Sequence, residues 1–269
     1  MTTSDAASLA VAVVQFAPSA DSRANLDQIA HGVQTAAERG ARVVLLPEYS
    51  NVFIDPFDES LAARAEPLDG PFITALTALA ERWAVVIVCG VLESTGSGVR
   101  NTAVAVDASG IRASYRKLHL YDAFGHRESD WITAGEIAPP ETFEIAGFRF
   151  GLMTCYDLRF PEVARTLADV DVDVMLVPAA WMRGPLKEFH WRTLLTSRAI
   201  ENTAYVVAAD HPPPLGVGNS AVVDPQGVAI AGIGTGTEVV VAHLDRALLD
   251  RVRMVNPALR LRRFQVIPR

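Results

Sequence analysis

Residues 148–162 read FRFGLMTCYDLRFPE, and this stretch predicts both the fold class and the place of the chemistry. Residues 148–154 form an apolar run typical of a buried β-strand. Pro161 suits the first position of a helix, with Glu162 in its first turn. Cys155 is therefore expected just beyond the C-terminal end of a strand, which is where open α/β sheets bind their ligands.

The rest of the chain continues this alternation of strand and helix patterns. Short runs rich in Val, Leu and Ile predict buried strands, and apolar residues at helical spacing predict the helices between them. Two further segments alternate in polarity around turn residues and predict antiparallel pairs, so the sequence indicates an α/β fold with mixed pairing. The predicted strands are 10–16, 43–46 and 85–91, the helices 22–39 and 72–82, and the antiparallel pairs 102–115 and 221–227.

Length and composition limit the classes of partner. The 269 residues, half of them hydrophobic, are expected to form one domain, 1–269. A net charge of −7 argues against nucleic acid, which requires a basic surface. The longest apolar run, 83–92, is about half of the roughly 20 residues that a membrane span needs, so no membrane is expected.

The two cysteines lie in different surroundings. Cys89 ends an apolar run and is predicted to be a buried core thiol, whereas Cys155 precedes the polar, turn-like residues 156–159. Two cysteines in such different contexts fit a reducing compartment better than a disulfide framework. Together with the lack of a signal peptide at 1–5, they predict a cytoplasmic protein.

Cys155 is a candidate nucleophile. A free thiol has a pKa of about 8.5, so it needs a base to accept its proton and a cation to favour negative charge. The alternative is a cysteine that only packs in the core, which is common for free thiols. The polar residues after Cys155 favour the nucleophile.

Candidate partners for the thiol stand at other strand ends. Glu48 follows the apolar residues 43–47, and burial there would raise its pKa towards that of a general base. Lys117 ends the strand that starts at Ile111 and can hold an oxyanion by charge. Glu128 lies in an aperiodic loop, 119–140. Each of these residues, taken alone, is also compatible with an ordinary surface charge.

Arg159 follows Cys155 by four residues, in an otherwise apolar setting. Its planar guanidinium can bind a substrate carboxylate with two hydrogen bonds. The alternative is an internal ion pair with Asp157 or Glu162. The histidines show no zinc-ligand spacing, and the glycines at 232–236 do not follow the dinucleotide pattern, so neither a metal nor an organic cofactor is expected.

Three segments together resemble the nitrilase superfamily of carbon–nitrogen hydrolases. The segments are LLPEYS with Glu48, YRKLHLYD with Lys117 and GLMTCYDLRFPE with Cys155, in the chain order of that family's Glu-Lys-Cys triad. The resemblance continues through ESDWITAG, which holds Glu128, and through WRTLLTSRAIENTAYVVAA and GNSAVVDPQG, so it spans nearly the whole chain. It implies Glu48 as general base, Lys117 as oxyanion-stabilising cation, Cys155 as nucleophile and Glu128 as accessory carboxylate.

The resemblance also implies a fold, an activity and an assembly. The fold is an α-β-β-α sandwich with two mixed β-sheets, which forms a homodimer or a higher homo-oligomer through the helix near 161–167. The segments CYDLRFPE and RAIEN resemble the ω-amidase and deaminated-glutathione-amidase branch. The loop at 121–125 is shorter than in those amidases, and it faces the substrate, so the exact substrate stays open.

We therefore predict an amidase that cleaves a small, carboxylate-bearing amide through a cysteine thioester and releases ammonia. Arg159, Tyr156, Trp181 and Tyr49 are predicted to contact the substrate. Hydrolysis of a nitrile or an N-carbamoyl group by the same fold is an alternative. A catalytically silent protein that acts as an interaction module is another.

Overall fold

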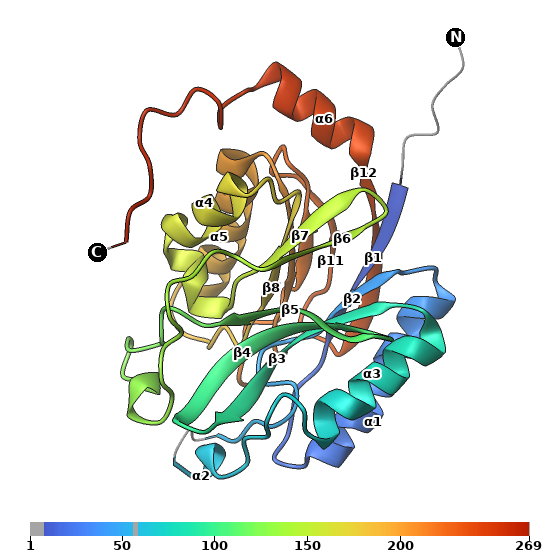
Figure 1. The fold of residues 1–269 in the computed structure, drawn as a ribbon, viewed down its shortest axis with the longest axis vertical. Coiled ribbons are helices and arrows are strands. Elements are labelled where there is room, and N and C mark those ends of the chain that lie inside the picture. Colours follow the sequence, from blue (N-terminus) through green and yellow to red (C-terminus); the bar gives the residue numbers. More distant parts are fainter. Residues whose placement is uncertain (1–7, 56–58, 269) are drawn as a thin grey trace.

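The computed structural model describes residues 8–55 and 59–268. Within these ranges, two six-stranded sheets stack face to face between layers of helices (Figure 1). This arrangement confirms the predicted α-β-β-α sandwich with two mixed sheets.

The first sheet has the strand order β12-β1-β2-β3-β4-β5. Its centre is parallel, because β1 pairs with β2 and β2 with β3 in the same direction. The flanking pairs β1–β12, β3–β4 and β4–β5 are antiparallel, which makes the sheet mixed. Its strands are β1 (Ser8–Gln15), β2 (Val43–Leu45), β3 (Val86–Thr95), β4 (Gly98–Asp107), β5 (Gly110–Arg116) and β12 (Glu238–Asp245).

The second sheet has the order β11-β10-β9-β8-β7-β6 and the same design. Strands β7, β8 and β9 are parallel, and β6, β10 and β11 are added by antiparallel pairing. Both predicted antiparallel pairs are confirmed, one in each sheet. The strands are β6 (Thr142–Ile145), β7 (Phe148–Leu152), β8 (Val174–Pro178), β9 (Tyr205–Ala209), β10 (Ala221–Val223) and β11 (Ala229–Gly232).

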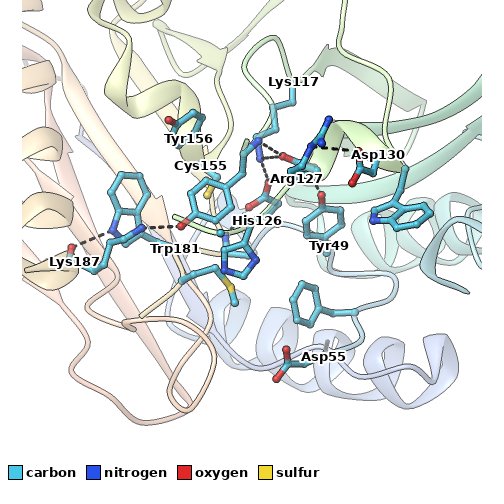
Figure 2. Close-up of a pocket in the computed structure, with 18 of the residues that line it drawn as sticks. Tyr49, Asp55, Lys117, His126, Arg127, Asp130, Cys155, Tyr156, Trp181 and Lys187 are labelled. Atoms are coloured by element: carbon cyan, nitrogen blue, oxygen red, sulfur yellow. Dashed lines mark hydrogen bonds and ion pairs between the residues drawn. The ribbon is translucent and has the colours of Figure 1, made fainter. Parts of the chain in front are cut away.

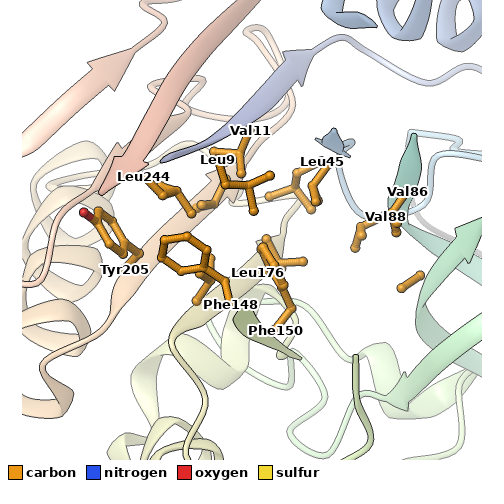
Figure 3. Close-up of a cluster of buried hydrophobic side chains, with 14 of the residues drawn as sticks. Leu9, Val11, Leu45, Val86, Val88, Phe148, Phe150, Leu176, Tyr205 and Leu244 are labelled. Carbon is orange, nitrogen blue, oxygen red and sulfur yellow. The ribbon is translucent and has the colours of Figure 1, made fainter. Parts of the chain in front are cut away.

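The core between the sheets is built from alternate residues of the central strands. Leu9, Val11 and Leu45 of the first sheet face Phe148 and Leu176 of the second (Figure 3). All five are at most 2% exposed, and burying one such side chain contributes about 1.5–3 kcal/mol. This packing holds the carboxyl ends of β2 and β8 close to each other, where the Glu48 N–H donates to the Ala179 carbonyl at 3.3 Å.

Helices cover the outer faces of both sheets. Helices α1 (Ser22–Glu38) and α3 (Pro71–Trp83) pack on the first sheet, and α4 (Pro161–Asp169) and α5 (Lys187–Asn202) pack on the second. Asp21 caps α1 by accepting the backbone N–H groups of Arg23 and Ala24 at 2.9 and 3.2 Å. The short helix α2 (Glu59–Ala62) and the late helix α6 (Arg246–Val255) complete the set.

Three predicted strands end earlier in the structure: those at 10–16 and 43–46 by one residue, at Gln15 and Leu45, and the one at 148–154 by two. The strand expected at 148–154 ends at Leu152, because the chain turns into a 3₁₀ helix, η2 (Cys155–Arg159), whose N-cap is Thr154. The long segment at 119–140 is irregular, as predicted, except for a second 3₁₀ helix, η1 (Glu128–Asp130). No helix among the described residues is long and apolar enough to cross a membrane.

Candidate active site

Cys155 begins the turn that connects β7 to α4. Its φ of +45° lies in the left-handed region, which is unfavourable for a residue with a side chain. Two hydrogen bonds between Thr154 and Asp157 hold the turn: the Asp157 N–H donates to the Thr154 carbonyl at 2.9 Å, and the Asp157 carboxylate accepts the N–H of Thr154 at 3.2 Å. The strained backbone is thus maintained by local hydrogen bonds on both sides of the cysteine.

Asp157 anchors this turn to the neighbouring sheet. Its Oδ1 accepts the backbone N–H of His119 at 3.0 Å and lies 2.8 Å from the His119 Nδ1, while its Oδ2 accepts the Tyr115 hydroxyl at 2.8 Å. Burial and this carboxylate raise the pKa of Tyr115 well above its usual value, so the phenol remains a donor. Asp157 itself is fully buried, and all of its contacts serve to position the Cys155 turn.

Glu48 stands just past the end of β2. Its Oε2 accepts the backbone N–H of Ala180 at 2.7 Å, and its Oε1 accepts from Asn101 Nδ2 at 2.6 Å. Gly90 permits the close approach of β3, because a Cβ at that position would lie 2.6 Å from the Glu48 Cα. The carboxylate is 1% exposed, so it is held in one orientation without access to bulk water.

Lys117 lies between two carboxylates. Its Nζ is 2.9 Å from Glu48 Oε1 and 2.9 Å from Glu128 Oε2, and the side chain is only 2% exposed. Burial alone lowers the pKa of the amine, but Glu128, Glu48 and Cys155 outweigh it and hold the pKa well above its usual value. The residue is therefore a fixed ammonium ion at the bottom of the site.

Glu128 completes this group from the loop between β5 and β6. It accepts the Asn101 amide at 2.8 Å on Oε1 and the Tyr121 backbone N–H at 2.6 Å on Oε2, and Tyr49 donates its hydroxyl to Oε1. Burial raises its pKa, but Lys117 and these hydrogen bonds outweigh that effect, so the net pKa is below the usual range. Glu128 thus balances the charge of Lys117.

The Cys155 thiol lies beside this charged group. Burial and the Glu48 carboxylate raise its pKa well above the usual value, against the opposing effect of Lys117. The resting sulfur is therefore a neutral thiol next to a carboxylate that can accept its proton. Cys89 differs, because burial alone raises its pKa and the side chain packs among core residues, as the sequence predicted.

A cavity of about 430 Å³ opens over Cys155. Figure 2 shows Trp181 and Lys187 on one side of it and Tyr49 and Asp130 on the other, with Cys155 between them in this view. This volume suits a small molecule. The structure thus brings every sequence-predicted site residue to one cavity: Glu48, Tyr49, Lys117, Glu128, Cys155, Tyr156, Arg159 and Trp181.

Arg159 points its guanidinium at aromatic rings. Its Cζ lies 4.6 Å from the Trp181 ring centroid and 5.9 Å from that of Tyr156. The alternative of an ion pair with Asp157 or Glu162 is wrong: among the described residues the guanidinium makes no ion pair. Asp157 is instead saturated by Tyr115, His119 and Thr154.

Three buried polar residues of the site were not predicted. Asn101 bridges the two carboxylates, and Asp210 accepts the backbone N–H of Trp181 at 2.6 Å. His211 Nε2 lies 2.7 Å from the Glu48 carbonyl, and burial lowers the pKa of His211 to about 4, so its ring is neutral. Each of these residues follows or interrupts a run of apolar residues typical of a strand. Such a pattern indicates a polar group at a strand end, but it does not indicate which residue that group contacts.

Lys187 was also missed, although the sequence carries a signal for it. Lys117 and Lys187 are the only two lysines in the sequence, and arginine supplies the other 22 basic residues. Both lysines line the cavity. Across residues 8–55 and 59–268, no cluster of His, Cys, Asp or Glu has the geometry to hold a metal ion.

The chain is similar to several known proteins. The family model for carbon–nitrogen hydrolases matches residues 10–254. A deaminated glutathione amidase of Escherichia coli O157:H7 is 39% identical over 257 residues, which cover 94% of this chain and 97% of that protein. An omega-amidase of Saccharomyces cerevisiae is 30% identical over 280 residues, covering 95% and 94% of the two chains.

A solved structure is similar at the level of the fold. It is a mutant amidase from Nesterenkonia sp. AN1 with the acetamide moiety of fluoroacetamide covalently added at its active-site cysteine. The TM-score is 0.82 at 26% identity, and the match covers 98% of this chain and 97% of that one.

Proposed function

This chain belongs to the carbon–nitrogen hydrolase family, and from that premise we propose that it hydrolyses small, carboxylate-bearing amides through a thioester on Cys155. The family predicted from the sequence motifs is confirmed, as is the class of enzyme, an amidase. The roles of single residues and the choice of substrate are our proposal.

One observation carries this proposal. A buried ammonium, Lys117, lies 2.9 Å from each of two carboxylates, and the Cys155 thiol adjoins the same group. Nucleophilic attack by a thiol needs a proton acceptor and a stabiliser of the developing oxyanion within reach of one carbonyl. Glu48 and Lys117 provide the two groups at one end of the cavity.

In the first half-reaction, Glu48 accepts the thiol proton as the sulfur attacks the amide carbonyl. Lys117 and the backbone N–H of Tyr156 stabilise the oxyanion, and one such donor is worth about 3–4 kcal/mol of barrier. The protonated Glu48 then gives its proton to the amide nitrogen, the C–N bond breaks, and ammonia leaves. Cys155 now carries the acyl group as a thioester.

In the second half-reaction, Glu48 removes a proton from water, and the resulting hydroxide attacks the thioester carbonyl. The oxyanion again forms beside Lys117. When the C–S bond breaks, Glu48 returns the proton to the sulfur, the carboxylic acid leaves, and the neutral thiol of the resting enzyme is restored. Glu128 acts through Lys117, whose position and charge it maintains.

The test is hydrolysis by matched cysteine variants. We expect Cys155→Ala to lose turnover completely while keeping its fold, and Cys89→Ala to remain active, with ammonia release as the assay. Amide, nitrile and N-carbamoyl versions of one acid should be compared, and the amide is expected to be the best substrate. Turnover by Cys155→Ala would disprove the mechanism, whereas preference for the nitrile or carbamoyl compound would change the reaction.

We also propose that the protein is a homodimer that associates through α4. The C-terminal segment supports this, because Arg262 pairs with Asp169 at the end of α4. Exposed apolar side chains follow it, with Phe264 89% and Ile267 77% exposed. Light scattering should give the mass of a dimer, and Phe264→Asp should shift it towards the monomer; a monomeric parent protein would contradict the proposal.

Cytoplasmic localisation remains part of the proposal. Both thiols, Cys89 and Cys155, are free and buried, which suits a reducing compartment. Cell fractionation with compartment markers would test it, and recovery in an oxidising compartment would contradict it.

A further inference from the structure

Beyond Arg159, the cavity holds a second cation that the proposed mechanism does not use. We propose that Lys187 and Arg159 together form an anion subsite, which binds the carboxylate of the substrate and selects acidic over neutral amides. This inference rests on the proposed function, because it names the substrate group that this same cavity recognises.

The position of Lys187 is fixed by its surroundings. The residue begins α5 and is only 4% exposed. Its Nζ donates to the Tyr121 hydroxyl at 2.8 Å and lies 3.8 Å from the centroid of the Phe124 ring. The Trp181 indole N–H donates to the Lys187 carbonyl at 3.0 Å, which ties the start of the helix to the wall of the cavity.

Lys187 and Arg159 face the same aromatic rings. The Arg159 Cζ lies 5.3 Å from the Phe124 centroid and 4.6 Å from that of Trp181, and the Lys187 Nζ lies 5.8 Å from the Trp181 centroid. Within the described ranges neither cation has a carboxylate within 4.0 Å, in contrast to Lys117, which has two. Two like charges that are largely shielded from water and lack a counter-ion repel each other, so a bound anion would relieve their repulsion.

The unused donors of Arg159 match a carboxylate. Its Nε and Nη2 are buried and have no hydrogen-bond partner among the described residues. These two nitrogens form one edge of the guanidinium, which binds the two oxygens of a carboxylate in parallel. The compact Lys187 ammonium can then contact the same group as a point charge.

The lowered pKa of Lys187 is in line with an anion subsite whose anion is supplied by the ligand. Burial, and then the charge of Arg159, lower this pKa to about 8, while Cys155 acts in the opposite direction. The other polar group that faces the amine is the Tyr121 phenol, whose own pKa is raised to about 12 by burial and by Cys155, so it stays neutral. A carboxylate beside the amine would raise the lysine pKa again.

A pair of substrates of similar shape tests the subsite. Glutaramate carries a carboxylate opposite its amide, and pentanamide carries a methyl group there. We expect Lys187→Met to raise KM for glutaramate about 10- to 100-fold, which is the usual size of a lost charged hydrogen bond. The preference for glutaramate over pentanamide, as a ratio of kcat/KM, should fall by the same factor.

Two variants serve as controls. Lys187→Arg should restore much of the preference, because it keeps the charge. Arg183→Met removes an exposed cation four residues earlier, outside the cavity lining, and should leave the preference unchanged. Equal losses for both substrates in Lys187→Met, or an equal effect of Arg183→Met, would overturn the subsite.

A second measurement needs no turnover. Reductive methylation with labelled formaldehyde can be followed by mass spectrometry at Lys187 in the Cys155→Ala protein, with glutarate or pentanamide present. We expect glutarate to slow labelling of Lys187 severalfold and pentanamide to leave it unchanged. Equal labelling of Lys187 with glutarate and with pentanamide would refute the subsite. This test does not depend on whether a Lys187 variant folds. Turnover by Cys155→Ala would instead refute the proposed mechanism.

Discussion

The two ends of the cavity handle buried charge in opposite ways. At one end, Lys117, Glu48 and Glu128 pair with one another, and Asn101 bridges the carboxylates. At the other end, Arg159 and Lys187 lie against aromatic rings without a counter-ion among the described residues.

This difference indicates which end of the cavity carries out the reaction and which end recognises the substrate. A closed network of charges holds its groups in place before the substrate arrives, as catalysis requires. An open pair of cations leaves its strongest interaction to be made with the ligand. The paired end of the cavity therefore suits bond breaking, and the unpaired end suits the selection of an anionic substrate.

Breaking the paired end at Lys117 should have the largest effect. Lys117→Met leaves Glu48 and Glu128 buried together without a cation, and removing one partner of a buried ion pair costs about 3–5 kcal/mol. We expect that loss in the free energy of unfolding, measured with urea, together with loss of turnover. An unchanged free energy of unfolding would contradict the stabilising role of Lys117 between the two carboxylates.

Glu48→Gln separates charge from shape at the same end. The amide keeps the size of the carboxylate, and its oxygen can still accept the N–H of Ala180, but it cannot accept a proton. We expect kcat to fall about 10²- to 10⁴-fold, and the free energy of unfolding to fall as well, because Lys117 then keeps only one of its two carboxylates. Single-turnover kinetics should place the loss in formation of the thioester, and a fall in KM alone would contradict the role of base.

The pH dependence of binding sharpens the description of the unpaired end. Because the pKa of Lys187 is about 8, the amine is charged below that pH and neutral above it. The KM for glutaramate should therefore rise as the pH increases through 8, and the KM for pentanamide should not follow it. If KM changed with pH in the same way for both amides, the titrating group would act on catalysis and not on binding of the carboxylate.

The smallest effect is expected for stability at the unpaired end. Lys187→Met removes a buried cation without leaving a partner behind, so the free energy of unfolding at pH 7 should stay equal or rise by about 1 kcal/mol. The sign follows from linkage: a lysine with a lowered pKa opposes folding below pH 8, and this penalty disappears as the pH rises from 8 towards 10.5. A loss of several kcal/mol would instead assign Lys187 a structural role.

Much of the fold was predictable because its signals are local. Runs of β-branched residues predicted β1, β2 and β3, and turn residues predicted the β4–β5 and β10–β11 hairpins. The same logic placed Glu48, Lys117 and Cys155 at or just beyond strand ends. The predicted strand over 148–154 was two residues too long. The chain turns where the Asp157 carboxylate accepts the Thr154 N–H, and such a side-chain hydrogen bond does not alter the hydrophobic periodicity of the sequence.

The sequence by itself determined the fold class, the family and the order of the catalytic candidates, since each depends on residues close together in the chain. Only the tertiary structure decided the partners of the charged groups. Glu48 and Lys117 are separated by 69 residues and come into contact through the pairing of strands and the stacking of two sheets. Whether a buried charge is paired, like Lys117, or left open, like Arg159 and Lys187, depends on distances of a few ångströms between such segments, because Coulomb and hydrogen-bond energies fall steeply with separation.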